Sequence, residues 1–305
     1  MDLNTLYHRT VECWAERVNA VAGDQWDAPT PCTEWSVRDL VNHVVAEDLW
    51  TGPLMRGRTV EEVGHLFDGD VLGDDPIGTA LRAAAEATSV VAERLPRGEK
   101  VHLSYGEEDA AEYVRQLAAD HLVHAWDLAA AIGAKTRMDP QLVSEVRGWF
   151  AQREELYRAG GVVGPRARLA GEPQADLLAG FGRDARWSPN HGLLARFSAA
   201  FGSGDVDRIM ALMSDDAVFE STGPAPDGER HEGADAVRRV WERLFSGTRD
   251  PRFTEEESVV CGDRAVLRWR FSWTEDDGAE GHVRGVDVLR LRDGRVAEKL
   301  SYVKG

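Results

Sequence analysis

The spacing of hydrophobic residues in the first half of the chain predicts a succession of amphipathic helices. In residues 113–133, apolar side chains recur at steps of three and four, and Gly133 follows where such a helix would end. The same spacing predicts further helices over residues 3–22, 36–50, 79–95 and 140–157. Long helices joined by short connectors and one longer crossover are typical of an up-and-down four-helix bundle. We therefore expect residues 1–188 to form an all-α domain.

Glycine and proline indicate where these helices should stop. Gly52-Pro53 is expected to end the second helix, and Pro96 the third. Residues 55–76 are irregular and acidic, and should hold only a short helix near Val60. Three further segments complete this half: an extended piece at 101–105, an acidic turn at 106–109 and a loop-like stretch at 172–187.

The pattern changes after Ser188-Pro189-Asn190, which we interpret as a linker between domains 1–188 and 189–305. Two short helices are predicted at 193–201 and 206–213, and another at 234–245. Apolar and polar residues alternate in four segments, which predicts strands at 217–221, 253–261, 265–274 and 281–292. Asp-Gly turns at 277–278 and 293–294 join the later strands as hairpins. This half should be an α+β cone with a curved antiparallel sheet.

Two titratable residues lie inside the apolar stripe of the 113–133 helix. Asp120 and His124 are four positions apart, so their side chains stack on one face and can offer two ligands to one cation. His43 in the 36–50 helix is the best candidate for a third ligand, with Ser36 as the N-cap of that helix and Asp39 completing a capping box. A site with three protein ligands leaves a position open for water or substrate.

A simpler interpretation is that these are core polar residues whose hydrogen bonds are satisfied within the bundle. His121 also faces the stripe, as a supporting partner or a substitute ligand. Glu47, one turn beyond His43, could orient that histidine or be a solvated charge, and Asp127 is expected to support the fold. Cys32 is interpreted as part of a packed turn, because the neighbouring sequence holds no base or cation that would lower its pKa.

The residues around these candidates carry a resemblance. The segment Pro31-Cys-Thr-Glu-Trp-Ser-Val-Arg-Asp-Leu-Val-Asn-His43, together with Asp120-His-Leu-Val-His124-Ala-Trp-Asp, resembles the DinB-like metal-binding bundles of actinobacteria. It is most similar to the N-terminal domain of the mycothiol-dependent maleylpyruvate isomerase family. The resemblance implies His43, Asp120 and His124 as ligands of a divalent metal, zinc being expected, and mycothiol as a co-substrate. Asp120 stands where the family's isomerases more often have Glu, which shortens the reach by one methylene.

The second half resembles the SnoaL-like polyketide cyclases of the nuclear transport factor two-like superfamily. Four segments carry the resemblance, at residues 201–207, 212–219, 231–238 and 285–296. The resemblance implies a cavity and, on a strand, an acid/base Asp, for which Asp287 is the candidate. The alternation of side chains along a strand places Asp287 on the opposite face of the sheet from Val286 and Val288. That face borders either the pocket or the solvent. His231 and Trp273 are weaker candidates for the cavity lining. Domains of this superfamily often pair through their sheets, so the resemblance also implies a homodimer.

Composition limits the partners and the compartment. Lys+Arg 36 against Asp+Glu 53 gives a formal charge of −17, which disfavours binding to nucleic acid or to an anionic membrane. The sequence has no long apolar run and no basic-then-apolar start, so neither a membrane span nor a signal peptide is expected. Three scattered cysteines, Cys13, Cys32 and Cys261, give no disulfide framework and fit a reducing cytoplasm.

Two functional hypotheses follow. The first is a metal-dependent enzyme of the thiol S-transferase or isomerase type, in which the metal site activates mycothiol against a small electrophilic metabolite. The second places the main role in the SnoaL-like domain, as a cofactor-free cyclase or isomerase or as a ligand-binding module, with the bundle as a scaffold.

Overall fold

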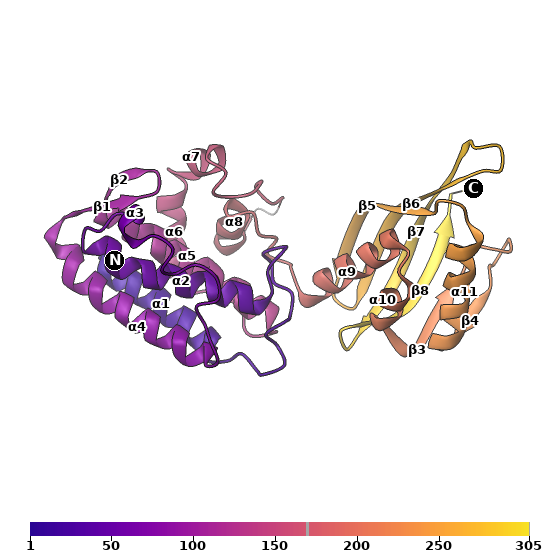
Figure 1. The fold of residues 1–305 in the computed structure, drawn as a ribbon, viewed down its shortest axis with the longest axis horizontal. Helices are drawn as coiled ribbons and strands as arrows, with labels where there is room; N and C mark the ends of the chain where they lie inside the picture. Colours follow the sequence, from indigo (N-terminus) through magenta and orange to yellow (C-terminus); the bar gives the residue numbers. More distant parts are fainter. Residues whose placement is uncertain (169–170, 305) are drawn as a thin grey trace. The chain divides into compact units, whose positions relative to one another are not determined.

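The computed structural model describes residues 1–168 and 171–304. Contacts between residues divide the chain into two compact units, Met1–Ser188 and Pro189–Gly305 (Figure 1). Each unit has its own hydrophobic core. None of the helices in the described ranges is long and apolar enough to cross a membrane.

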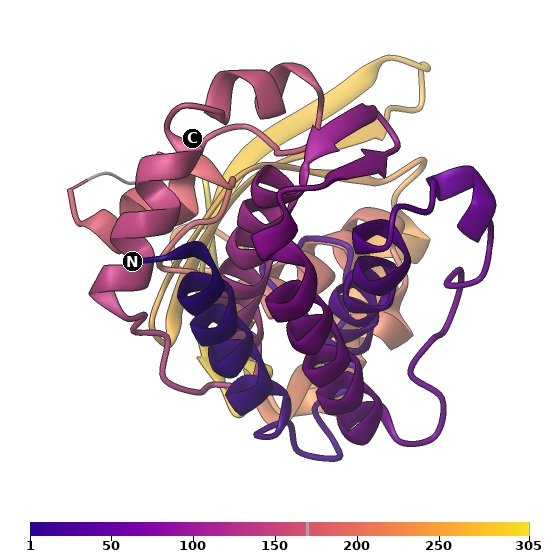
Figure 2. The ribbon, with the colours of Figure 1, turned by 90° about the vertical axis from the view of Figure 1, so that its left-hand side faces the viewer.

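The first unit is built around the four-helix bundle expected from the sequence. Its long helices are α1 (Leu3–Val18), α2 (Val37–Met55), α4 (Pro76–Arg94) and α5 (Ala110–Ala131). Both α4 and α5 pack against α1 and α2, and Figure 2 shows the indigo α1 and the purple α4 lying alongside each other. Helix α5 is buried along most of its length, because neighbours cover it on several sides. Its polar side chains therefore need partners inside the protein.

The start of α2 agrees with the sequence, whereas its end does not. Ser36 caps the helix: its Oγ accepts from the Asp39 backbone N–H at 3.2 Å, and the Asp39 carboxylate accepts from the Ser36 N–H at 2.9 Å. The predicted stop at Gly52-Pro53 is wrong, because α2 continues through Pro53 to Met55. Pro53 cannot donate a backbone hydrogen bond to the preceding turn, and only two residues of the helix follow it, so the proline comes where the helix is about to end.

Shorter elements complete the first unit and correct three sequence interpretations. The expected acidic turn at 106–109 is a strand, β2 (Gly106–Asp109), which pairs antiparallel with β1 (Lys100–Leu103). The helix expected over 140–157 breaks at 151–153. The stretch 172–187, which we expected to be a loop, contains a helix at Pro173–Gly180. Its two leucines, Leu177 and Leu178, are adjacent, so the sequence shows no helical spacing of apolar residues there. The remaining elements are α3 (Val60–Val63), η1 (Leu95–Arg97), α6 (Pro140–Phe150), α7 (Glu154–Ala159) and α8 (Pro173–Gly180).

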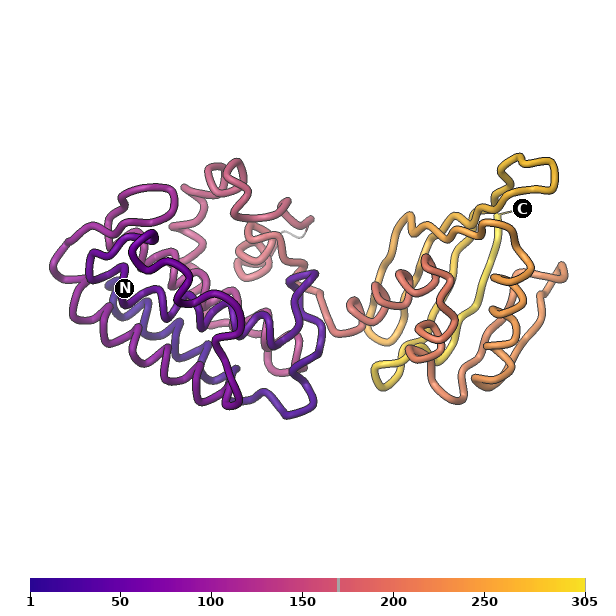
Figure 3. Tube along the Cα trace, viewed as in Figure 1, coloured from indigo at the N-terminus to yellow at the C-terminus, as the bar shows by residue number. Residues whose placement is uncertain are grey.

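The second unit is an α+β domain in which three helices cover one face of a curved sheet. Within the described residues the strand order is β4-β3-β8-β7-β6-β5, with β3 parallel to β8 and the other neighbours antiparallel. The trace in Figure 3 shows β6 turning into β7 as a long hairpin. The helices are α9 (Pro189–Ser203), α10 (Val206–Ala211) and α11 (Ala234–Gly247). The strands are β3 (Met213–Glu220), β4 (Arg230–Glu232), β5 (Arg252–Cys261), β6 (Arg264–Thr274), β7 (Glu280–Arg292) and β8 (Arg295–Val303).

The core of this unit lies between the helices and the inner face of the sheet. Phe197 and Trp241 are fully enclosed and pack against inward-facing strand residues such as Leu267 and Leu289. The predicted helix at 206–213 ends at Ala211, because Met213 already pairs with Val296 of β8. The fold class expected from the sequence is thus confirmed for both halves.

Removal of the Ser36 cap should weaken the bundle at the helix that carries His43. We expect Ser36→Ala to lower the free energy of unfolding by about 1 kcal/mol, because one backbone N–H at the helix start loses its acceptor. Ser36→Asn, which restores an acceptor, should stay close to the wild type. Urea unfolding followed by far-UV circular dichroism measures the difference, and equal stabilities of all three proteins would contradict the role of the cap.

Candidate functional site

The three ligands predicted from the sequence come together between α2 and α5. Asp120 Oδ1 lies 3.7 Å from His43 Nε2 and 3.3 Å from His124 Nε2. One candidate ligand atom from each residue lies within 4.8 Å of the others. His43 and Asp120 are about a third exposed, at 31% and 30%, whereas the His124 side chain is 7% exposed. Two packed helices thus direct one carboxylate and two imidazoles at a common point.

Two observations indicate that His43, Asp120 and His124 could bind a divalent cation. Asp120 Oδ2 is buried and has no hydrogen-bond partner, although a buried carboxylate oxygen without a partner is costly. Asp127 Oδ2 lies 2.9 Å from His124 Nδ1. If Nδ1–H donates to Asp127, the lone pair of Nε2 is free to bind a metal, which is how carboxylates commonly orient zinc-binding histidines. Zinc readily accepts such a mixed imidazole and carboxylate set.

The site is continued by a charged group that the sequence did not predict. Arg183, which follows α8, places Nη2 3.0 Å from Asp127 Oδ2 and donates to Cys32 Sγ at 3.1 Å. The thiol in turn lies 3.4 Å from Asp127 Oδ2. Cys32 does lie in a turn, in which the Trp35 N–H donates to its carbonyl oxygen. The sequence around it could not show the cation beside the thiol, since the guanidinium comes from a part of the chain 151 residues away.

Asp127 has a larger part in this site than the sequence indicated, because it touches both His124 and Arg183. The three-residue spacing between His124 and Asp127 was the available signal. Cys32, His124 and Asp127 also form a possible ligand group. The Arg183 guanidinium already pairs with Asp127 and would repel a second cation there, so the set containing His43 and Asp120 is the better metal site.

Burial and the neighbouring charges shift the pKa values of the site residues in opposite directions. Burial disfavours ionised Asp120, but His124 and His43 outweigh it and hold the pKa of Asp120 well below its ordinary value. Burial also lowers the pKa of His124, yet the Asp120 charge and the hydrogen bonds to Asp120 and Asp127 raise it well above its usual range. Burial would raise the pKa of Asp127, and Arg183 with His124 lowers it. The two carboxylates thus favour the charged form of His124 in the metal-free protein.

A pocket of about 630 Å³ opens in front of these ligands. Trp35 forms part of its wall and packs against the His43 ring, with ring centroids 4.8 Å apart. Glu47 also lines the pocket, where burial and the neighbouring Asp120 charge raise its pKa. The pocket thus holds a second carboxyl group, one that takes up a proton more readily than an exposed glutamate does.

His121 does not join this site. Its Nε2 lies 3.1 Å from Asp48 Oδ1 and its Nδ1 2.8 Å from the Leu117 carbonyl oxygen, and both side chains of the pair are fully buried. Burial lowers the pKa of His121, but the Asp48 charge and these contacts raise it overall. The prediction that His121 supports or replaces a ligand is therefore wrong, and the residue belongs to a separate buried pair.

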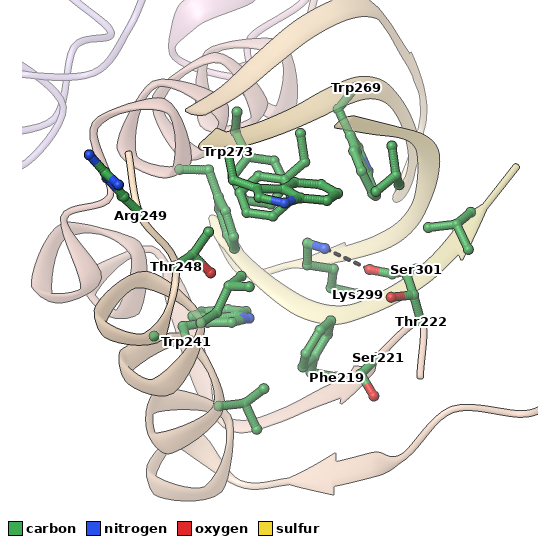
Figure 4. A pocket seen from close by; sticks show the side chains of 18 of the residues that line it. Phe219, Ser221, Thr222, Trp241, Thr248, Arg249, Trp269, Trp273, Lys299 and Ser301 are labelled. Atoms are coloured by element: carbon green, nitrogen blue, oxygen red, sulfur yellow. Dashed lines mark hydrogen bonds between the residues drawn. The ribbon is translucent and has the colours of Figure 1, made fainter. Parts of the chain in front are cut away.

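The second unit holds its own cavity, of about 680 Å³, between the helices and the sheet (Figure 4). Seven aromatic side chains belong to its wall, with Trp273 among them as predicted, whereas His231 is not among the lining residues. Asp287 is buried behind the wall: its Oδ2 lies 2.9 Å from Lys299 Nζ, and its Oδ1 accepts from Ser301 Oγ at 2.7 Å. Lys299 and Ser301, which the sequence reasoning missed, line the cavity in its place.

Comparison with known proteins supports both halves of this description. Residues 7–129 match the mycothiol maleylpyruvate isomerase N-terminal domain, and residues 194–299 match the SnoaL-like domain. An uncharacterized protein found in two strains of Mycobacterium tuberculosis is 31% identical over 180 residues, 58% of this chain and 87% of that protein.

Among solved structures, an NTF2-like protein of unknown function from Mesorhizobium loti is 39% identical. It covers 38% of this chain and 90% of its own, with a TM-score of 0.34. A putative polyketide cyclase from Sinorhizobium meliloti is 25% identical and covers 36% of this chain and 92% of its own, with a TM-score of 0.30. The chain therefore belongs to the family of the mycothiol maleylpyruvate isomerase N-terminal domain, followed here by a SnoaL-like domain.

Proposed function

We propose that the bundle is a metal-dependent enzyme that activates a low-molecular-weight thiol. The activated thiol would either be transferred to a small electrophilic metabolite or catalyse the isomerisation of that metabolite. The convergence of His43, Asp120 and His124 at the wall of a pocket carries this proposal. The domain families themselves are of the isomerase and cyclase type. Mycothiol is the proposed thiol, because the matched family is named for it.

The residues of the pocket divide the work of such a reaction. His43, Asp120 and His124 would hold the divalent cation, zinc being our proposal, and Asp127 would keep the Nε2 lone pair of His124 directed at it. When bound, the cation supplies positive charge that lowers the pKa of a thiol beside it. Glu47 is suited to take up the proton released at the sulfur, because its own pKa is raised.

The SnoaL-like domain gives a second candidate function. Its aromatic cavity, with the buried Lys299 and Asp287 pair at one side, is an arrangement for binding an organic ligand without a cofactor. In this second function, Asp287 would act through Lys299, since Lys299 and not Asp287 lines the cavity. Protein that is fully active without metal would favour this function over the first.

We also propose that the chain pairs with a second copy through the outer face of the sheet. Val259, Val266, Val288 and Leu300 are cross-strand neighbours in one row across β5, β6, β7 and β8. Val259 and Val266 are 52% and 38% exposed. Side chains of both signs flank the row, so two copies can match apolar row to apolar row and charge to opposite charge.

The metal proposal is tested by the zinc content of the purified full-length protein. Wild type should carry about one zinc per chain, and His124→Ala should lose it and the thiol-transfer activity while the circular dichroism spectrum is kept. His65→Ala, which changes a histidine whose side chain is 95% exposed, is the matched control and should keep both. Metal-free wild-type protein that is fully active would overturn the proposal.

Zinc affinity should fall as the pH is lowered. The pKa of His124 is raised in the metal-free protein, so below that pKa zinc must displace a proton from the imidazole. If one proton is displaced, the zinc affinity should weaken about tenfold for each unit by which the pH is lowered below the pKa of His124. Above that pKa the affinity should no longer change with pH. Asp120 stays ionised because its pKa is lowered. Titration against a chelator of known affinity between about pH 6 and 8 measures the slope, and an affinity independent of pH would contradict it.

The pairing proposal predicts that Val266→Glu converts a dimer to a monomer, because a charge would be buried in the apolar row. Light scattering coupled to size-exclusion chromatography measures the mass. Leu156→Glu changes an apolar side chain that is 69% exposed in the first unit, and it should leave the dimer intact. Monomeric wild-type protein at high concentration would refute the pairing.

A further inference from the structure

Lys299 is a buried cation beside an aromatic cavity. Its side chain is 6% exposed, yet it lines the cavity of the second unit. Burial of an ammonium group is costly unless the group is paired, and Asp287 provides the pairing at 2.9 Å. The pair lies on β7 and β8 in the middle of the sheet, so its position is fixed by strands on both sides.

The contacts of the ammonium leave one donor unused by oxygen. Lys299 Nζ contacts Asp287 Oδ2 and donates to Ser301 Oγ at 2.7 Å. Ser301 in turn donates to Asp287, so the three groups form a closed set. An ammonium has three N–H donors, and the third has no oxygen acceptor among these contacts. Nζ also lies 5.3 Å and 5.0 Å from the ring centroids of Phe201 and Phe219.

The surroundings select against a cationic ligand. Trp241, Trp269 and Trp273 stand around Lys299 in Figure 4, as in a cage that would otherwise attract an organic cation. The cage already contains a positive charge, and Arg249 and Lys304 add two more at the cavity wall. The acidic side chains of the wall, Glu275 and Asp276, are exposed on the β6–β7 turn, and Glu275 accepts from Trp273 Nε1 at 2.9 Å.

We propose that Lys299 anchors a planar organic anion, an aromatic carboxylate or phenolate, whose oxygen accepts the third N–H. The aromatic walls would stack on the flat body of the ligand, and a cavity of about 680 Å³ is of the size that encloses such molecules. Asp287 pairs with the ammonium and orients it, and Ser301 fixes the Lys299 side chain. The inference rests on the second candidate function and is independent of the metal centre.

The test is calorimetric binding of three probes of one shape to the full-length protein. The probes are 2-naphthoate, the neutral 2-naphthylmethanol and the cationic 2-naphthylmethylammonium. The wild type should prefer 2-naphthoate. The double variant Lys299→Met with Asp287→Asn removes the ammonium without leaving a buried charge unpaired. It should bind 2-naphthoate about 10- to 100-fold more weakly, as expected for loss of one charge-assisted hydrogen bond, and bind the neutral probe nearly unchanged.

Arg239→Met is the matched control, because it removes an exposed cation of the same unit that does not line the cavity. It should change 2-naphthoate affinity by less than about threefold. Equal binding of 2-naphthoate by the wild type and the folded double variant would overturn the anchor, as would a preference for the ammonium probe. No binding of any probe would instead refute the ligand-binding function of the domain.

Discussion

The pairing of buried charges on α5 is the constraint on which the first unit depends. This helix carries Asp120, His121, His124 and Asp127 in its middle, where bundle helices and the Arg183 segment enclose it. A buried charge without a partner costs several kcal/mol, so each needs a partner, and three of the four find one on another element. His43 from α2 meets Asp120, Asp48 from α2 meets His121, and Arg183 meets Asp127. The packing of these elements and the chemistry of the site are therefore the same set of contacts.

The three contacts differ in what they leave unsatisfied. His121 and Asp48 are enclosed together and do not line the pocket beside Asp120. Asp127 is fully engaged by Arg183 and His124. Only around Asp120 does a buried oxygen lack a hydrogen bond while the group borders a pocket, among the described members of this network. A cation there would satisfy the oxygen, which is why we propose the metal at this position.

The second unit solves the same electrostatic problem with a different outcome. Asp287 is buried, and Lys299 on the neighbouring strand neutralises it, with Ser301 bridging the two. The carboxylate is thereby withdrawn from the cavity and the ammonium is presented to it. The strand acid that we expected at the cavity thus supports a cation instead, so the fold does not by itself give the reacting group.

Local periodicity determined much of this protein in advance. Residues three and four apart on a helix, or two apart on a strand, share a face whatever their surroundings, so the bundle helices, the hairpins, the Ser36 cap and the pairing of Asp120 with His124 could all be predicted from the sequence. The strand β2 and the helix α8 escaped prediction because their short segments carry no clear periodicity. Tertiary structure alone decided that Arg183 reaches Cys32 and Asp127, and that Lys299 stands in front of Asp287. Those contacts join residues that are distant in the sequence or that lie on different strands. They form because the burial of apolar surface brings whole elements together, and the local sequence pattern does not show which elements will meet.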